Sequence, residues 1–179
     1  MFKKLSSRSV YKNKWTEVFE DEIEFPNGQK GIYGYMRRSD GSGIVVVNAS
    51  NEVLLIKQYR YPIGKTQWSI PGGAIDGTDP EESAIRELEE ETGVTVIYLE
   101  KLLEVYPLSS GSTEKESIYL ARVDSVELPN EDVSDTDEFV EEKRFVPISE
   151  VLQMIDAGEN IDSVASSVIQ IVARKLKIS

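Results

Sequence analysis

The segment PGGAIDGTDPEESAIRELEEETGV, residues 71–94, constrains this chain more than any other. Asp79 can cap a helix, and Pro80 suits the first helical position because its missing N–H would find no partner there. Acidic residues follow in the positively polarised first turn, and Gly93 can end the helix in a left-handed conformation. The sequence therefore predicts a helix over roughly residues 80–92.

The predicted helix has two distinct faces. Glu87, Glu90 and Glu91 gather on one face, where only Arg86, four residues before Glu90, offers charge compensation. A hard divalent cation would relieve the repulsion, because Mg²⁺ and Mn²⁺ prefer carboxylate and carbonyl oxygens. A purely solvated acidic face is the alternative. The other face is apolar and comprises Ala84, Ile85 and Leu88.

A glycine pair precedes the helix and bears on the choice between these alternatives. Pro71, Gly72 and Gly73 follow the apolar residues Trp68 and Ile70. Glycines let a backbone approach a ligand closely and expose a carbonyl oxygen to it. A ligand site between this loop and the acidic face is therefore favoured.

These residues resemble the Nudix hydrolase signature, which reads Gly, five residues, Glu, seven residues, then Arg-Glu-apolar-any-Glu-Glu-any-Gly-apolar. Residues 86–94 fill its second half without a mismatch. The first half departs from it, because the usual glutamate falls at Thr78 and the loop after Gly72 is one residue short. Asp76 or Asp79 could stand in for that carboxylate.

The resemblance implies a metal site on this helix. In the family the Arg-Glu-x-x-Glu-Glu segment binds the metal, so Glu87, Glu90 and Glu91 are the expected ligands, joined by the Gly72 carbonyl. Mg²⁺ is the expected ion, with Mn²⁺ as a substitute. Arg86 is expected to orient a helix carboxylate rather than touch substrate, because it points some 100° around the helix from Glu87.

Composition narrows the remaining chemistry. The 179 residues suit one domain with some elaboration, and they include no Cys and no His. Disulfides, thiol nucleophiles, histidine bases and the usual zinc sites are thereby excluded. A net charge of −12 argues against a long nucleic-acid partner, whereas a small phosphorylated substrate bridged by Mg²⁺ is compatible. The absence of a secretory signal and of a long apolar run predicts a cytoplasmic protein with no membrane partner.

The N-terminal part reads as an extension ahead of the main domain. The first 13 residues are polar and basic, typical of a loose start or an edge strand. A β-hairpin is then predicted around the turn Pro26-Asn27-Gly28. The turn-rich residues 39–43 separate a hairpin extension, 1–43, from a main domain, 44–179. Related nucleoside-diphosphate-sugar hydrolases use such a sheet to dimerise, so the resemblance implies a homodimer through the hairpin.

Two apolar segments, IVVVN and EVLLIKQYR, are predicted to be buried strands. Arg60 ends the second one, and its QYR triplet resembles the segment that supplies a substrate-binding arginine in ADP-ribose pyrophosphatases. A solvated residue at the strand end is the alternative. Tyr59 and Trp68 are candidates for stacking on a base, with core or rim packing as their alternative.

Strand material is next expected over VTVIYLEKLLEVYP, followed by the polar loop LSSGSTEKE and another strand, SIYLARV. Loops carry reactive groups beside rigid scaffolds, and Glu114 is the candidate general base. A surface glutamate is its alternative role. ADP-ribose pyrophosphatases usually have a proline fifteen residues after the signature, within Tyr-Pro-x-Pro-Gly; here that position is Ser109, although Tyr106 and Pro107 fit.

The acidic stretch LPNEDVSDTDEFVEE is expected to be an exposed excursion. Glu138 and Glu141 within it are the next candidates for the base or for a further metal ligand. A strand, KRFVPIS, and two structural helices complete the chain. The first helix begins at Ser149 and stops at Gly158, and the second begins at about Asp162.

These elements predict an α/β fold with a mixed sheet packed between helices. The resemblance specifies it as the Nudix α/β/α sandwich with an added N-terminal β-hairpin. The implied reaction is Mg-dependent hydrolysis of the diphosphate linkage in an ADP-ribose-like nucleoside diphosphate sugar, giving a nucleoside monophosphate and a sugar phosphate. The alternatives are hydrolysis of nucleoside triphosphates or dinucleoside polyphosphates, and a noncatalytic nucleotide-binding module.

Overall fold

The computed structural model describes residues 1–75, 77, 79–124, 128 and 140–178. The chain forms two compact units. The first comprises Met1–Asp40 and Tyr106–Glu116, and the second comprises Gly41–Val105 and Ser117–Ser179. Each unit is described by itself.

The first unit is built on a three-stranded antiparallel sheet in the order β1-β2-β3. The predicted hairpin is therefore present as β2 and β3, and the basic N-terminal residues add β1 as an edge strand. All ten residues of β1 are exposed. The strand bounds are β1 Lys3–Lys12, β2 Glu17–Glu24 and β3 Lys30–Arg37.

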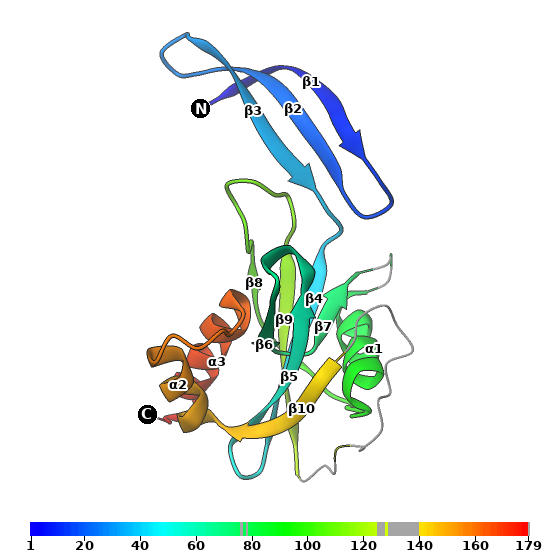
Figure 1. Ribbon diagram of the computed structural model, residues 1–179, viewed down its shortest axis with the longest axis vertical. Helices are drawn as coiled ribbons and strands as arrows, with labels where there is room; N and C mark the ends of the chain where they lie inside the picture. The colour runs from blue at the N-terminus through cyan, green and yellow to red at the C-terminus, as the bar shows by residue number, and fades with distance from the viewer. Residues whose placement is uncertain (76, 78, 125–127, 129–139, 179) are drawn as a thin grey trace. The chain divides into compact units, whose positions relative to one another are not determined.

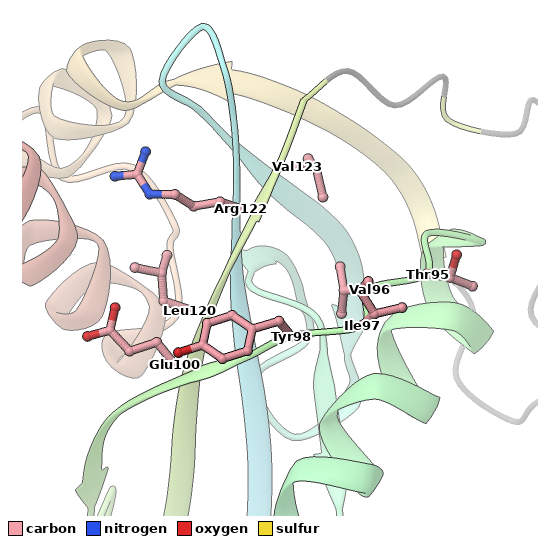
Figure 2. A pocket seen from close by; sticks show the side chains of 8 residues that line it. All are labelled: Thr95, Val96, Ile97, Tyr98, Glu100, Leu120, Arg122 and Val123. Atoms are coloured by element: carbon pink, nitrogen blue, oxygen red, sulfur yellow. The ribbon is translucent and has the colours of Figure 1, made fainter.

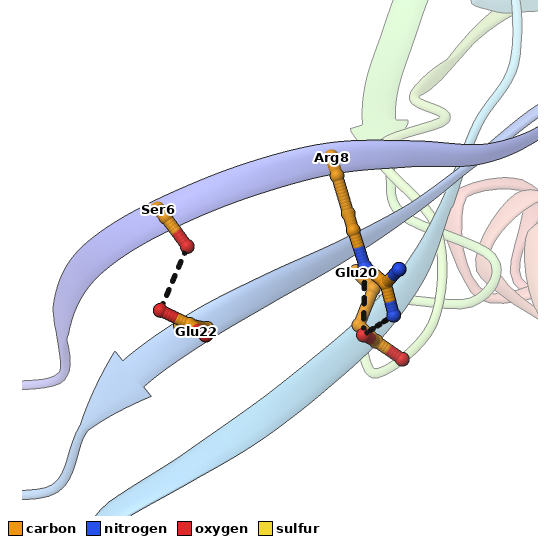
Figure 3. A network of polar contacts seen from close by, with 4 residues as sticks. All are labelled: Ser6, Arg8, Glu20 and Glu22. Carbon is orange, nitrogen blue, oxygen red and sulfur yellow. Dashed lines mark hydrogen bonds and ion pairs between the residues drawn. The ribbon is translucent and has the colours of Figure 1, made fainter.

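Polar pairs connect β1 to β2 across this sheet (Figure 3). Arg8 lies opposite Glu20, and its Nε donates to Glu20 Oε1 at 3.1 Å. The Ser6 hydroxyl donates to Glu22 Oε2 at 3.0 Å. The hydrogen bond to Glu20 raises the pKa of the Arg8 guanidinium. Opposite charges directly across a strand pair favour this register over a one-residue slip.

The polar loop after Pro107 packs against β3 within the same unit. The Met36 N–H donates to the Gly111 carbonyl at 2.8 Å, and the Thr113 N–H donates to the Met36 carbonyl at 3.0 Å. The Tyr33 hydroxyl donates to the Ser110 carbonyl at 2.9 Å. These bonds satisfy backbone groups that would otherwise rely on water, so the loop has a defined conformation.

The second unit contains a seven-stranded sheet in the order β10-β5-β4-β9-β8, with β6 paired to β5 and β7 paired to β4 (Figure 1). The β4 and β9 strands run in the same direction, because the Ala49 N–H after one donates to the Asp124 carbonyl after the other. Since β4 and β5 pair antiparallel, the sheet is mixed, as predicted. The strand bounds are β4 Gly41–Asn48, β5 Glu52–Arg60, β6 Lys65–Ser69, β7 Gly72–Ala74, β8 Glu100–Val105, β9 Glu116–Val123 and β10 Val140–Pro147.

Both faces of this sheet are covered by helices, which confirms the predicted α/β/α sandwich. Along β4, Ile44 and Val46 enter one core cluster, whereas Val45 and Val47 enter the other. The first cluster also contains residues of α1, and the second contains residues of α2 and α3. A strand buried on both faces explains the uninterrupted apolar run IVVV. The helix bounds are α1 Pro80–Thr92, α2 Ile148–Asp156 and α3 Ser163–Leu176.

The helix ends follow local signals in the sequence. The Asp79 carboxylate accepts a hydrogen bond from the Glu81 N–H at 2.8 Å, and Gly93 closes α1 at φ 73°. The Asp162 carboxylate caps α3 in the same way. None of the helices among the described residues is long and apolar enough to cross a membrane.

One strand is shorter than expected. The segment VTVIYLEKLLEVYP was predicted to supply strand material, but β8 occupies only Glu100–Val105. Ile97 and Tyr98, before β8, are exposed. Val94 and Leu99 enter the α1 core cluster, so the residues between them connect two anchor points without sheet pairing.

Candidate active site

The glycine loop lies directly against strand β4. Gly72 pairs with Gly43, and Gly73 pairs with Ser42. A Cβ atom on Gly72 would lie only 2.4 Å from the Ser42 carbonyl oxygen, a distance that real Cβ atoms do not tolerate. The close approach of these two backbones therefore requires glycine at this position.

Glu91 connects α1 to this loop. Its Oε2 accepts the Gly72 N–H at 2.9 Å, and its Oε1 accepts the Gln58 Nε2 at 3.0 Å. Glu91 is 5% exposed. Buried carboxylates are stable when their oxygens accept hydrogen bonds, which the backbone of β7 and the side chain from β5 provide here.

Glu87 lies one helical turn earlier, against the second glycine. A Cβ on Gly73 would come within 2.6 Å of the Glu87 carboxyl carbon. The Glu87 side chain is 16% exposed, so it is largely enclosed by this loop. Gly73 thus leaves room for the Glu87 carboxylate to approach the loop backbone, whereas Gly72 leaves room for β4.

Arg86 contacts two of the three helix carboxylates. Its Nη2 lies 2.8 Å from Glu87 Oε1, and its Nη1 lies 2.9 Å from Glu90 Oε2. The pairing with Glu90 is the i,i+4 compensation that the sequence predicts. The expected role of Arg86 in orienting these carboxylates stays a prediction. Glu90 is the most open of the three, with 40% of its side chain exposed.

The donor set of this site fits a hard divalent cation. Three carboxylates and the backbone of Gly72 are oxygen donors of the type that Mg²⁺ and Mn²⁺ prefer. Gly73 leaves beside Glu87 the space that a Cβ would fill. Among the described residues, no group of three acidic side chains is close enough to hold an ion in the present arrangement, in which Glu87 and Glu90 contact Arg86. The ligand roles of Glu87, Glu90, Glu91 and the Gly72 carbonyl stay predictions.

A tyrosine beneath the start of α1 is held neutral. Tyr119, on β9, is 4% exposed and belongs to the α1 core cluster. Burial raises the pKa of its phenol, Lys101 lowers it, and the negative charges of Asp79 and Glu81 raise it further. Its hydroxyl therefore stays protonated at neutral pH and contributes no charge near the acidic helix.

The predicted substrate-binding residues fall on different faces of the sheet. Side chains alternate along β5, so Arg60 shares a face with Gln58, while Tyr59 points to the opposite face. Trp68 is 9% exposed and packs in the α2 and α3 core cluster. Its ring is covered by the guanidinium of Arg144 at 4.8 Å, which favours the core role over base stacking. Substrate contacts by these residues stay predictions.

The candidate bases have defined partners. Glu114 belongs to the first unit, where its carboxylate pairs with the Arg38 guanidinium at 3.1 Å. Glu141, in β10, accepts a hydrogen bond from the Thr66 hydroxyl at 3.0 Å. Glu138 lies outside the described residues, as do the loop positions Asp76 and Thr78.

Gln58 is the site residue that the sequence analysis missed. It is 2% exposed and donates to a helix carboxylate, although it lies in a predicted buried strand. The available signal was a polar residue at an inward position of the apolar run EVLLIKQYR. Its partner, 33 residues away, follows only from the fold.

A pocket of about 310 Å³ lies elsewhere in the second unit, at the far end of β9 (Figure 2). Residues of β8, β9 and the segment before β8 surround it, and none of the α1 carboxylates does. The pocket is therefore separate from the acidic site. Its lining comprises Thr95, Val96, Ile97, Tyr98, Glu100, Leu120, Arg122 and Val123.

The chain is similar to several known proteins. The chain is 29% identical to the ADP-ribose pyrophosphatase of Bacillus subtilis (strain 168), over 94% of this chain and 90% of that protein. It is also 29% identical to the methanol dehydrogenase activator of Bacillus methanolicus, over 90% of this chain and 86% of that protein. A GDP-mannose pyrophosphatase of Yersinia enterocolitica is 34% identical over 68% of this chain and 66% of that protein.

The fold has a counterpart among solved structures. A crystal structure of an ADP compounds hydrolase superposes with a TM-score of 0.77 at 24% identity, covering 98% of this chain and 94% of the other. Residues 2–36 match the nucleoside diphosphate sugar hydrolase N-terminal domain, and residues 37–165 match the NUDIX domain. The chain therefore belongs to the Nudix hydrolase family.

Proposed function

We propose that this Nudix hydrolase cleaves the diphosphate linkage of a nucleoside diphosphate sugar, with ADP-ribose as the reference substrate. The observation that carries the proposal is the arrangement of three carboxylates on α1, where Glu91 and Glu87 lie against the Gly72-Gly73 backbone and Glu90 pairs with Arg86. The matched N-terminal domain and the relatives named as ADP-ribose pyrophosphatases support the sugar nucleotide class.

The proposed reaction is an attack by water on one phosphorus of the diphosphate. The bond from that phosphorus to the bridging oxygen breaks, which releases a nucleoside monophosphate and a sugar phosphate. Mg²⁺ held by Glu87, Glu90, Glu91 and the Gly72 carbonyl would supply charge neutralisation on the phosphates and a more acidic bound water.

The chain's own residues have separate tasks in this proposal. Glu91 is fixed by the Gly72 N–H, which sets the loop against the helix. Arg86 orients Glu90. Glu114 accepts the proton of the attacking water, and Arg60 binds a distal phosphate. The water oxygen ends on the attacked phosphorus, so the atoms of substrate and water are conserved in the two products.

Two alternatives keep specific support. Ser109 replaces the proline that usually marks ADP-ribose pyrophosphatases, which leaves nucleoside triphosphates and dinucleoside polyphosphates as alternative substrates of the same site. The relative in Bacillus methanolicus is named as an activator of another enzyme, which leaves room for a noncatalytic nucleotide-binding module.

A substrate panel tests the proposal directly. ADP-ribose, GDP-mannose, other nucleotide sugars, dinucleoside polyphosphates and nucleoside triphosphates are incubated with Mg²⁺ or with a chelator, and products are separated chromatographically. We expect Mg-dependent conversion of one nucleotide sugar to a nucleoside monophosphate and a sugar phosphate. Preferential cleavage of triphosphates would reassign the substrate, and a completely inactive panel would shift weight to the binding module.

Neutralising one helix carboxylate tests the metal site. We expect Glu90→Gln to lower kcat/KM roughly 100-fold or more, equivalent to about 2.7 kcal/mol of transition-state stabilisation. Glu89→Gln is the matched control, because Glu89 is an exposed glutamate on the same helix. It should retain activity, and both variants should keep the wild-type melting temperature. Full turnover in Glu90→Gln would remove Glu90 from the mechanism.

Substitution of a second glutamate tests the assignment of the general base. Glu114→Gln should slow turnover roughly 100-fold or more, the usual contribution of a positioned base, while Mn²⁺ binding to the protein is unchanged. Glu141→Gln provides the comparison, since Glu141 is the described alternative. If Glu114→Gln retains its rate and Glu141→Gln loses it, the assignment of the base is reversed.

We also propose a homodimer through the N-terminal sheet. The sheet exposes large apolar side chains, including Ile32 at 66% and Val10 at 49%, which a partner copy would cover. Sedimentation velocity should therefore give twice the mass of one chain. Ile32→Asp should shift the protein toward monomer while its circular dichroism spectrum stays that of the folded wild type, and a monomeric wild-type protein would contradict the proposal.

A further inference from the structure

Among the residues that the structure describes, three buried side-chain oxygens on the α1 face of the sheet have no hydrogen-bond partner: Ser42 Oγ, Gln58 Oε1 and Ser69 Oγ. Ser42 lies two residues before Ile44 on β4, and Gln58 lies four residues after Leu54 on β5. Both apolar residues belong to the α1 cluster, so strand alternation places Ser42 and Gln58 on that face. Ser69 pairs with Ile56, which lies between Leu54 and Gln58 on β5, so Ser69 is on the same face of the sheet.

The orientation of the Gln58 amide is set by Glu91. An ionised carboxylate is only an acceptor, so the amide must present its N–H group, and Nε2 donates to Glu91 Oε1 at 3.0 Å. Rotating the amide by 180° would place two oxygen atoms against each other. The bond to Glu91 therefore leaves the amide oxygen of Gln58 without a partner, although this residue is only 2% exposed.

This arrangement is poor as a device for stability alone. A buried amide carbonyl without a partner carries a desolvation penalty that offsets much of the benefit of the N–H bond. The neighbouring inward positions of β5, Leu54 and Ile56, are fully buried apolar residues. The presence of a polar residue at this one position therefore indicates that Gln58 acts on Glu91.

The three helix carboxylates are held by different groups. Arg86 contacts Glu87 and Glu90, whereas Gln58 and the Gly72 N–H contact Glu91. The Gly72 N–H bonds one oxygen of the Glu91 carboxylate, Oε2. A second bond, from Gln58 to the other oxygen, fixes the plane.

We propose that Gln58 is a positioning residue, which fixes the Glu91 carboxylate plane for binding of a divalent cation. The inference rests on the proposed function, because it assumes that Glu91 is a metal ligand. Gln58 touches neither the cation nor the substrate in this proposal. Residues that hydrogen-bond a metal ligand typically contribute 10–100-fold in metal affinity or activity, by orienting that ligand.

The test replaces the amide with an apolar side chain of similar length. Gln58→Met is compared with wild type for Mn²⁺ affinity, measured on the protein alone by the electron paramagnetic resonance signal of free Mn²⁺, and for kcat, KM and melting temperature. We expect Mn²⁺ affinity and kcat to fall roughly 10–100-fold, with KM for the nucleotide and the melting temperature near the wild-type values.

Gln170→Met is the matched control. Gln170 lies on α3, on the other side of the sheet, and its amide donates to the Ser166 carbonyl of its own helix. The same change of side chain there should leave Mn²⁺ affinity and kcat unchanged. A general effect of replacing a partly buried glutamine would appear in both variants.

A double-mutant cycle identifies the residue through which Gln58 acts. Glu91→Gln alone should weaken Mn²⁺ binding, and adding Gln58→Met should weaken it no further, because the carboxylate to be positioned is already gone. Additive losses would show that Gln58 acts elsewhere. If Gln58→Met fails to fold, Gln58→Asn replaces it, since Asn keeps the amide but shortens its reach by one methylene.

The outcomes separate this inference from the proposed function. Wild-type protein that binds Mn²⁺ and hydrolyses a nucleotide, alongside a Gln58→Met variant that does both equally well, overturns the inference and leaves the function standing. Wild-type protein that does neither overturns the proposed function, and the inference with it. If Gln58→Met has a lower melting temperature than wild type but unchanged Mn²⁺ affinity, Gln58 has a structural role only.

Discussion

The hydrogen bond from the Gly72 N–H to the Glu91 carboxylate is the contact on which the candidate site depends. It joins Glu91 on α1 to Gly72, 19 residues earlier in the chain, and it is partly buried, so that water competes less for it. Bonds to charged groups contribute about 1.5–3 kcal/mol, and a buried carboxylate without them would cost more. Glycine is required at this position because a Cβ would collide with the Ser42 carbonyl oxygen of the paired strand β4.

The three glutamates Glu87, Glu90 and Glu91 of α1 differ in their exposure and in the groups that contact them. Glu91 is 5% exposed and held by β5 and β7, whereas the Glu90 side chain is 40% exposed and contacts Arg86. Glu87 lies between these extremes, at 16% exposure. An immobile carboxylate costs little entropy when it binds a ligand, and a mobile one can adjust to it. A graded set of this kind suits a cation that changes its surroundings during a reaction.

The parts of the molecule that local chemistry determines could be predicted from the sequence. The cap at Asp79, Pro80 and the left-handed Gly93 define α1 within a single segment, and both its ends agree with the prediction. The strand before Val105 was predicted too long, because apolar residues that anchor a connection look the same as those of a strand. Gln58 could not be assigned at all, since its role depends on a partner brought close by β5 and α1 packing.

The loop that carries Glu114 and Ser109 is structurally a part of the N-terminal sheet. It joins β8 to β9 in the sequence, yet its backbone bonds go to Met36 on β3, and Glu114 pairs with Arg38 just beyond that strand. The conformation of the loop therefore depends on the sheet, and a change of side chain in β3 would alter the loop without touching α1. The sheet and the acidic helix can thus diverge separately, one adjusting the groups that the loop presents and the other preserving the carboxylates.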